Sequence, residues 1–325
     1  MPLPLLQVRN LTTRFTTQRG RVTAVDNVSF DIDAGETVAL VGESGSGKSV
    51  TALSIMRLIP SPPGRIESGE VFFEGRDLFK LDGAGIRGVR GNKIAMIFQE
   101  PMSSLNPALS VGLQIAEPIN VHRGTAWANA LEQAKVLMGR VRMPDAASRL
   151  ASYPHQYSGG MRQRVMIAMA LACSPRLIIA DEPTTALDVT VQAQILDLLK
   201  ELTLETGSSL LLITHDLGVV ARYADRVAVM YGGRIVETAP ARELYKRPHH
   251  PYTRGLMASV PRLDGDTAQR LLPIEGQPPD LAQLPAGCAF SPRCRSVSEI
   301  CHTARPPLTQ VAARHFKACF NDTRA

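Results

Sequence analysis

A glycine-rich segment near the N-terminus contains the residue types that bind phosphate. Residues 42–49 read Gly-Glu-Ser-Gly-Ser-Gly-Lys-Ser and fit the pattern G-x-x-x-x-G-K-[ST]. Glycines let the backbone curl so that successive N–H groups, and the N-terminus of a following helix, point at an anion. Lys48 would reach the β- and γ-phosphates of a nucleotide, and the Ser49 hydroxyl would ligate Mg²⁺. The segment therefore predicts a site for a nucleoside triphosphate.

An apolar run that ends in two acids supplies the second set of candidate residues. Residues 177–180 read Leu-Ile-Ile-Ala, and Asp181 and Glu182 follow directly. In a doubly wound sheet the C-terminal ends of the strands carry the site. We expect Asp181 to hold Mg²⁺ through water and Glu182 to polarise the water that attacks the γ-phosphate. Solvated acids at a strand end are the alternative interpretation, and the phosphate loop argues against it.

Alternating strands and helices must position these residues. Apolar runs at 37–41, 93–98, 177–180 and 210–214 predict buried strands, and helical spacing predicts helices over 49–58 and around 191–199. Short β-rich runs at 5–9, 22–33 and 70–73 predict further strands, antiparallel in the first two cases, and residues 108–172 are almost entirely helical in pattern. The pattern predicts an α/β core with an antiparallel β subdomain and a helical insertion.

The composition is that of a globular protein, with 44% hydrophobic and 20% charged residues among 325. A net charge of +6 suggests acidic partners, but the 36 Lys and Arg residues are dispersed, which argues against a dedicated nucleic-acid surface. No apolar run approaches the roughly 20 residues that span a bilayer. The N-terminus also lacks the pattern of a secretion signal, so we expect a cytosolic location.

A third motif makes the sequence recognisable. Residues 157–164 read Tyr-Ser-Gly-Gly-Met-Arg-Gln-Arg and resemble the signature motif of ABC ATPases, although Tyr157 and Met161 depart from its commonest form. The resemblance implies that Ser158, Gly159 and Gly160, at a helix start, face a nucleotide held by a different subunit.

Other family motifs follow in order along the chain. Gln99 resembles the Q-loop glutamine that senses Mg²⁺ and water, and residues 185–188 resemble the D-loop, which ends in Asp188. His215 resembles the switch histidine, which can hydrogen-bond the γ-phosphate. Phe15 aligns with the aromatic residue that stacks on adenine, although a core role is nearly as consistent with its position.

Together these motifs imply that ATP and Mg²⁺ bind at Phe15, Gly42, Glu43, Ser44, Gly45, Ser46, Gly47, Lys48, Ser49, Val50, Gln99, Asp181, Ser158, Gly159, Gly160 and Asp188. Within that set the metal would lie at Ser49, Gln99 and Asp181, and catalysis would rest on Lys48, Gln99, Glu182 and His215. The implied fold is a P-loop NTPase of the ABC ATPase type.

Longer sequence segments indicate which subfamily of ABC ATPases the chain resembles. Residues 97–107, 188–194, 250–254, 273–279 and 287–294 resemble the ATPase subunits of oligopeptide and dipeptide importers, a group that includes nickel and glutathione uptake systems. The chain looks closest to the D-type subunit, which pairs with an F-type ATPase.

The resemblance implies a head-to-tail ATPase dimer, two permease subunits, an indirect link to an extracytoplasmic binding protein, and no nucleic acid. The chain would be peripheral, at the cytoplasmic face of the inner membrane. Nickel chelate and glutathione stay open as alternative cargoes. A non-transport ABC ATPase of DNA repair or translation is less consistent with a single cassette that has no long coiled-coil insertion.

The composition changes near residue 240. Eleven of the 23 prolines lie from Pro240 onward, and four of the five cysteines fall in the last 38 residues. We therefore predict an ABC ATPase domain over 1–240, with a helical subdomain at about 100–170, and a C-terminal extension rich in Cys and Pro over 241–325.

The cysteines of the extension form a candidate metal site. Cys288, Cys294, Cys301 and Cys319 would stay reduced in the cytosol, so four thiolates predict a metal set rather than disulfides. Their wide spacing favours a [4Fe–4S] cluster over zinc, and some members of the branch with this pattern carry such a cluster. Zinc and free thiols stay open. Cys173, in a helical pattern, is predicted to be a core residue.

Overall fold

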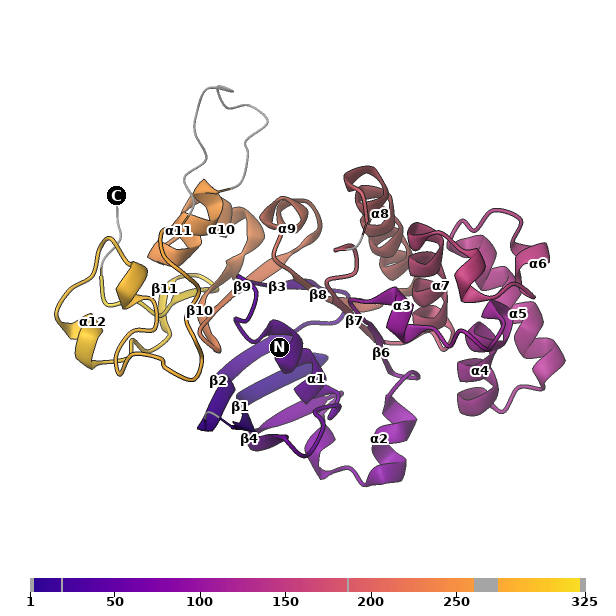
Figure 1. Cartoon of the computed structure of the whole chain (residues 1–325), viewed down its shortest axis with the longest axis horizontal. Coiled ribbons are helices and arrows are strands. Elements are labelled where there is room, and N and C mark those ends of the chain that lie inside the picture. Colours follow the sequence, from indigo (N-terminus) through magenta and orange to yellow (C-terminus); the bar gives the residue numbers. More distant parts are fainter. Residues whose placement is uncertain (1–2, 19, 186, 260–273, 322–325) are drawn as a thin grey trace. The chain divides into compact units, whose positions relative to one another are not determined.

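The computed structural model describes residues 3–18, 20–185, 187–259 and 274–321 (Figure 1). Its contacts divide the chain into two compact units. The first unit comprises residues 1–32, 37–79 and 213–325, and the second comprises 33–36 and 80–212. The boundary predicted at residue 240 falls inside the first unit and stays a prediction. Each unit is described by itself.

The first unit contains an antiparallel sheet of order β2-β1-β4-β5. Its strands are β1 (Leu6–Thr17), β2 (Gly20–Ile32), β4 (Gly64–Phe73) and β5 (Arg76–Asp77). β1 pairs with β2 from Leu6 opposite Ile32 to Thr17 opposite Gly20, so β1 is longer than the predicted run at 5–9, whereas β2 nearly matches the predicted run at 22–33. Buried apolar side chains of β1 face α1 (Lys48–Ile55), and Thr13 Oγ1 lies 2.7 Å from Ser54 Oγ of that helix.

A second group of strands in this unit has the order β11-β12-β10-β9-β3. It consists of β3 (Thr37–Val41), β9 (Arg226–Tyr231), β10 (Arg234–Pro240), β11 (Thr309–Ala312) and β12 (His315–Lys317). β3 is parallel to β9, and β10 is antiparallel to both β9 and β12. Since β12 and β11 come from the C-terminal extension, the extension continues the same sheet as the phosphate-loop strand.

Short helices complete the first unit. They are α9 (Leu217–Tyr223), α10 (Ala241–Lys246), α11 (Pro251–Ala258) and α12 (Ile300–Thr303), with 3₁₀ turns η1 (Leu78–Lys80, at the unit boundary) and η3 (Ser291–Arg293). One apolar core joins β3, β9, α9 and α10 to Tyr252 and Phe290. Because Tyr252 and Phe290 belong to the extension, the extension contributes to the hydrophobic core of the first unit and is not a separate appendage.

The second unit combines three strands with a helical bundle. Its strands β6 (Ile94–Ile97), β7 (Leu177–Asp181) and β8 (Ser209–Thr214, the last two residues assigned to the first unit) have the order β8-β7-β6, with β6 parallel to β7. The helices are α2 (Gly83–Val89), α3 (Pro101–Ser104), α4 (Val111–Arg123), α5 (Trp127–Arg140), α6 (Ala146–Arg149), η2 (Pro154–Gln156), α7 (Gly159–Leu171) and α8 (Val189–Thr206).

The bundle of this unit confirms the predicted helical insertion. α4, α5 and α7 pack against one another in Figure 1, and their contact faces are apolar. Cys173, just beyond α7, is buried, and its thiol lies 3.3 Å from the Pro118 carbonyl oxygen. The two units thus have the predicted components: an antiparallel subdomain, α/β strands and a helical insertion.

Candidate functional site

The phosphate loop connects β3 to α1 in the first unit, as the sequence predicts. Gly47 has φ +104°, and a Cβ at that position would lie 2.3 Å from the carbonyl oxygen of Ala24. Since backbone atoms cannot move aside as a flexible side chain does, only glycine fits there. A glycine-rich loop that runs directly into a helix start is the arrangement in which backbone N–H groups bind an anion.

Two side chains inside the loop fit a phosphate ligand. Lys48 is 4% exposed, and its Nζ donates to the carbonyl oxygens of Gly42 (2.8 Å) and Glu43 (3.1 Å). Among the described residues, Ser46 Oγ is one of four buried side-chain atoms without a hydrogen-bond partner. A buried hydroxyl that lacks a partner costs free energy, which a bound phosphate oxygen would offset. The loop therefore has the donor set that a nucleotide requires.

Glu43 of this loop is held by two residues of the C-terminal extension. Its backbone N–H donates to Tyr252 Oη at 2.8 Å. Its carboxylate accepts from Arg293 twice, from Nη1 to Oε2 at 2.7 Å and from Nη2 to Oε1 at 3.0 Å. Neither contact could be predicted from the sequence, because the two partners lie 209 and 250 residues away.

The second unit brings Gln99 and Glu182 together. Glu182 follows β7 with φ +44°, an unusual conformation for a residue with a side chain. Gln99 Nε2 lies 3.2 Å from Glu182 Oε2, and Thr185 Oγ1 donates to the same oxygen at 2.9 Å. Asp181, the last residue of β7, is 5% exposed. The resemblance implies that Gln99 and Glu182 belong to one site, but it did not predict a hydrogen bond between them or the contact with Thr185.

The signature motif and the D-loop also meet in the second unit. Ser158 caps α7 by accepting from the Met161 N–H at 3.4 Å, and Asp188 caps α8 by accepting from the Val191 N–H at 3.0 Å. A Cβ on Gly160 would lie 2.8 Å from Val191 Cγ1. The signature helix and the helix after the D-loop are therefore packed tightly, which glycine permits. Ala186 of the D-loop lies outside the described residues.

His215 and Phe15 belong to the first unit. His215 follows β8 and is exposed, directly before the Asp216 cap of α9. Phe15, on β1, is half-buried, and a Cβ on Gly64 would lie 2.8 Å from its Cε1 atom. The ring thus has a packing role in the sheet, and its stacking on adenine stays a prediction.

The four cysteines of the extension line one small cavity together with His250 and Phe290. They are Cys288, Cys294, Cys301 and Cys319. The N–H of Cys288 donates to the carbonyl oxygen of Cys301 at 2.8 Å. Burial raises the pKa of Cys288, and the charge of a neighbouring thiolate would raise it further. Four residues that are distant in sequence therefore converge, as a shared metal or cluster requires.

The same cysteines do not have the spacing of ligands to a single ion. Within the part of the chain that the structure describes, no three His, Cys, Asp or Glu side chains are close enough to hold one metal ion. Tetrahedral zinc with Zn–S bonds of about 2.3 Å draws its thiolates to roughly 4 Å of one another. A four-iron cluster is a larger body with one thiolate at each corner, so its ligands lie further apart. The described residues thus show no preformed site for a single metal ion, and a cluster at these cysteines stays a prediction.

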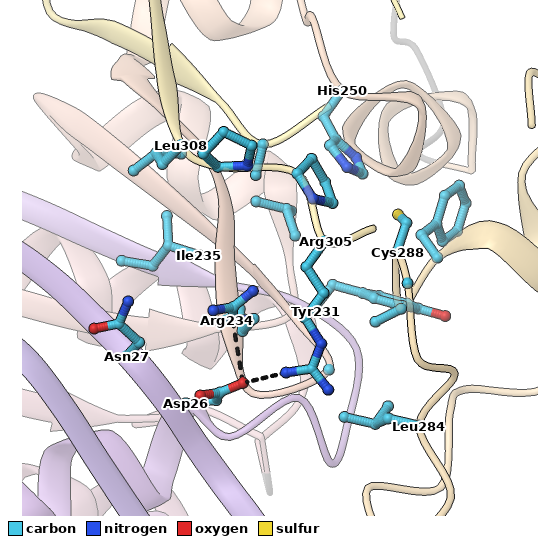
Figure 2. Close-up of a pocket in the computed structure, with 18 of the residues that line it drawn as sticks. Asp26, Asn27, Tyr231, Arg234, Ile235, His250, Leu284, Cys288, Arg305 and Leu308 are labelled. Carbon is cyan, nitrogen blue, oxygen red and sulfur yellow. Dashed lines mark hydrogen bonds and ion pairs between the residues drawn. The ribbon is translucent and has the colours of Figure 1, made fainter. Parts of the chain in front are cut away.

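A larger cavity, of about 420 Å³, lies between β2, the β9–β10 hairpin and the extension (Figure 2). Asp26 forms ion pairs at one side with Arg234 Nε (3.2 Å) and Arg305 Nη1 (3.0 Å). Leu284 and Leu308 line it from the extension, while Cys288 and Tyr231 connect it to the cysteine cavity and the Tyr252 cluster. These contacts hold the extension against the rest of the first unit.

The buried carboxylate of Glu237 also holds the extension in place, through hydrogen bonds to three of its histidines. Glu237 on β10 is fully buried and accepts from the N–H groups of His249 (2.6 Å) and His250 (2.9 Å) and from His315 Nε2 (2.7 Å). Burial alone would raise the pKa of Glu237, but the hydrogen bonds from His315 and the two backbone groups lower it below its ordinary value. Burial lowers the pKa of His250 to about 4.

Two family models match this chain. The model of ABC transporters covers residues 25–185, and that of the C-terminal region of oligopeptide/dipeptide transporters covers residues 236–301. A dimeric ATP-binding cassette solved in a post-hydrolysis state with ADP and Pi is 30% identical, with a TM-score of 0.65 over 73% of this chain and 99% of that one. Fold and motifs thus define the chain as an ABC-type ATPase.

Sequence relatives cover nearly the whole chain. A putative peptide import ATP-binding protein of Brucella melitensis is 53% identical over 97% of this chain and 96% of its own length. The dipeptide transport ATP-binding protein DppD of Bacillus subtilis is 50% identical over 99% and 96%, and the oligopeptide transport ATP-binding protein OppD of Salmonella typhimurium is 51% identical over 97% and 93%. The chain therefore belongs to the ATP-binding subunits of the oligopeptide/dipeptide branch of ABC transporters. None of its described helices is both long and apolar enough to cross a membrane.

Proposed function

We propose that this chain hydrolyses ATP to power the import of di- or oligopeptides through a pair of membrane permease subunits. The observation that carries the proposal is the identity of 50% or more to peptide, dipeptide and oligopeptide import proteins over nearly full length. The match extends into the C-terminal region of the oligopeptide/dipeptide family, which a generic ABC ATPase does not share.

The proposed site divides the work among named residues. Bound Mg²⁺ would neutralise phosphate charge, with Ser49, Gln99 and Asp181 around it. Lys48 and the loop N–H groups bind the phosphates, and Glu182 accepts a proton from the attacking water.

Around this centre, His215 orients the γ-phosphate, and Phe15 contacts the adenine. Ser158, Gly159, Gly160 and Asp188 serve the nucleotide bound by the partner ATPase.

The assembly follows from that division. The partner is a second ATPase of the F-type arranged head to tail, and the dimer works at the cytoplasmic face of the inner membrane. A binding protein outside the cytoplasm would select the cargo and reach this chain only through the permease.

Uptake measurements test the transport proposal. A strain lacking this chain should lose uptake of labelled di- and oligopeptides, and the wild-type chain, but not its Lys48→Ala variant, should restore it. Restored uptake of a nickel chelate or of glutathione, with peptide uptake unaffected by the deletion, would instead identify the alternative cargo. Unchanged uptake of all three would contradict the transport proposal.

We also propose that Cys288, Cys294, Cys301 and Cys319 hold a [4Fe–4S] cluster. Their convergence on one cavity supports a shared site, and the wide spacing of the four thiolates in sequence favours iron–sulfur over zinc. Full-length protein purified without oxygen should contain about four irons per chain and absorb broadly in the visible range.

Two cysteine variants sharpen this test. Cys319→Ser should lower the iron content, whereas Cys173→Ser, which changes a buried thiol in the other unit, should not. Zinc in place of iron, or four reactive thiols without metal, would contradict the cluster.

A further inference from the structure

Glu43 places a negative charge inside a loop proposed to bind an anion. It is the second residue of the phosphate loop, and its carbonyl oxygen lies 3.1 Å from Lys48 Nζ. A carboxylate on the second residue of that loop opposes the binding of a nucleotide that carries several negative charges, unless a cation compensates it. Lys48 contacts the backbone of Glu43, so the cation that pairs with this carboxylate must come from elsewhere.

Arg293 supplies that cation from the C-terminal extension. Its side chain is 6% exposed and that of Glu43 is 23% exposed, so the pair is largely removed from water. The two parallel N–H···O bonds form the bidentate arrangement that guanidinium and carboxylate prefer. The Coulomb attraction between two opposite charges is stronger at a site with little water than at an exposed surface, because the effective dielectric constant is lower.

The remaining hydrogens of Arg293 fix its orientation. Nε donates to the carbonyl oxygen of Glu275 at 2.9 Å, and Nη2 lies 3.3 Å from those of Ile274 and Gly276. Tyr231 Oη lies 3.5 Å from Nη1. The guanidinium is thus held by the backbone of the extension and presented to Glu43 in one geometry.

The position of Arg293 in the chain links it to the cysteine cavity. Arg293 ends the η3 turn, and Cys294 follows it directly. The N–H of Arg293 donates to Phe290, whose ring also lines that cavity. The fold of the cysteine segment therefore determines where the guanidinium lies.

We propose that Arg293 is a positioning residue for ATP binding: it neutralises Glu43 and so makes nucleotide affinity depend on the folded cysteine segment. The inference rests on the proposed ATP site. It gives the extension a task in the nucleotide site of its own chain, in addition to any cluster that it holds.

Charge compensation and simple structural support predict different outcomes. If Arg293 acts by neutralising Glu43, Arg293→Gln leaves an unpaired carboxylate in the loop and weakens ATP binding roughly ten- to hundredfold. Residues of the phosphate loop bind phosphate through the backbone, which Glu43→Gln keeps, and this substitution leaves an unpaired cation near the phosphates, so ATP should bind at least as tightly as to wild type. If the pair only supported the fold, breaking it from either side would weaken binding alike.

The experiment measures equilibrium binding of a fluorescent ATP analogue to the full-length chain, together with KM and kcat of the assembled transporter. Arg293→Gln should raise Kd and KM with a smaller change in kcat, and the double variant with Glu43→Gln should return Kd to within about threefold of wild type. Arg293→Lys should weaken ATP binding less than Arg293→Gln does, because lysine keeps the positive charge but cannot form the bidentate hydrogen bonds of the guanidinium group.

The matched control is Arg295→Gln. Arg295 lies two residues further along the same segment, and its ion pair with Glu275 is 72% and 76% exposed, so its loss should leave Kd unchanged. If Arg293→Gln fails to fold, the lysine variant and the double variant, which leave no unpaired charge, still decide the question.

Two results would overturn the inference: unchanged Kd in Arg293→Gln, or equal weakening by Arg293→Gln and Glu43→Gln. If instead the wild-type chain binds no ATP, the proposed function fails and not this pair alone.

Discussion

Replacing Glu182 with glutamine tests the central chemical assignment. The Glu182 carboxylate accepts hydrogen bonds from Gln99 (3.2 Å) and Thr185 (2.9 Å) through one oxygen. Glutamine has the same length and keeps an acceptor oxygen for these donors. The substitution therefore removes the charge and the ability to accept a proton while largely preserving the local geometry.

The size of the effect follows from that separation. General base catalysis contributes roughly 10²–10⁴ to a rate, which corresponds to about 3–5 kcal/mol of barrier. A hydrogen bond to a charged group contributes about 1.5–3 kcal/mol when it is shielded from water, but Thr185 is exposed and water can replace its hydroxyl, so its loss costs about 1 kcal/mol, or roughly fivefold. We expect Glu182→Gln to lower kcat by the first amount, and Thr185→Val, which keeps the carboxylate, to lower it by no more than the second.

Binding and turnover should respond differently. Removal of a negative charge near the γ-phosphate does not weaken ATP binding, so Glu182→Gln should bind ATP and accumulate as a closed ATPase dimer. The assay measures ATP hydrolysis by the complete transporter, ATP binding by the chain, and dimer formation with the partner ATPase by size exclusion.

Turnover of Glu182→Gln within tenfold of wild type would refute the role of proton acceptor. A loss in Thr185→Val as large as that in Glu182→Gln would show that loop geometry, and not the carboxylate, limits the rate.

Two further predictions concern Gly47 and His250 of the first unit, with Gly207 of the second unit as a control. Gly47→Ala and Gly207→Ala both place alanine at a positive φ, which lowers the free energy of unfolding by roughly 1–2 kcal/mol, but only the first puts a Cβ 2.3 Å from the Ala24 carbonyl oxygen. Urea titrations should show a loss of stability in both variants, and ATP titrations should show a loss of affinity in Gly47→Ala alone. Equal ATP affinity in the two variants would contradict the steric argument. Burial lowers the pKa of His250 to about 4, whereas an exposed histidine titrates near 6.5. Between these pH values the unfolded chain binds more protons than the folded chain. The free energy of unfolding should therefore fall by roughly 2 kcal/mol from about pH 7.5 to about pH 5. His250→Asn should flatten this dependence in urea titrations of reduced, metal-free protein, and an unchanged slope would contradict it.

Local patterns predicted the parts of the molecule that act over short distances. The spacing of residues 42–49 gave the phosphate loop, because the turn, the lysine and the helix start are consecutive in sequence. The resemblance assigned Gln99 and Glu182 to one site, and parallel β6 and β7 explain their proximity, since neighbouring strands end side by side.

Contacts between distant segments could not be predicted in this way. Arg293 lies in a proline-rich stretch with no periodicity, and nothing near it in sequence indicates a partner 250 residues away. The buried Glu237 is similar, since it occupies a strand position where the alternation alone does not reveal the His315 that satisfies it. The length of β1 was also underestimated, because its second half alternates polar residues that pair in the sheet without forming an apolar run.

The separation of Glu43 and Arg293 along the chain has a consequence for synthesis. The phosphate loop leaves the ribosome early, whereas its arginine follows 250 residues later, which at about 5–20 residues per second is a delay of roughly 10–50 seconds. A nascent or truncated chain thus carries the loop with its carboxylate uncompensated. Only a chain that has been synthesised past Arg293 would then bind nucleotide tightly. Because the ATPase dimer forms around bound ATP, incomplete subunits would be kept out of it.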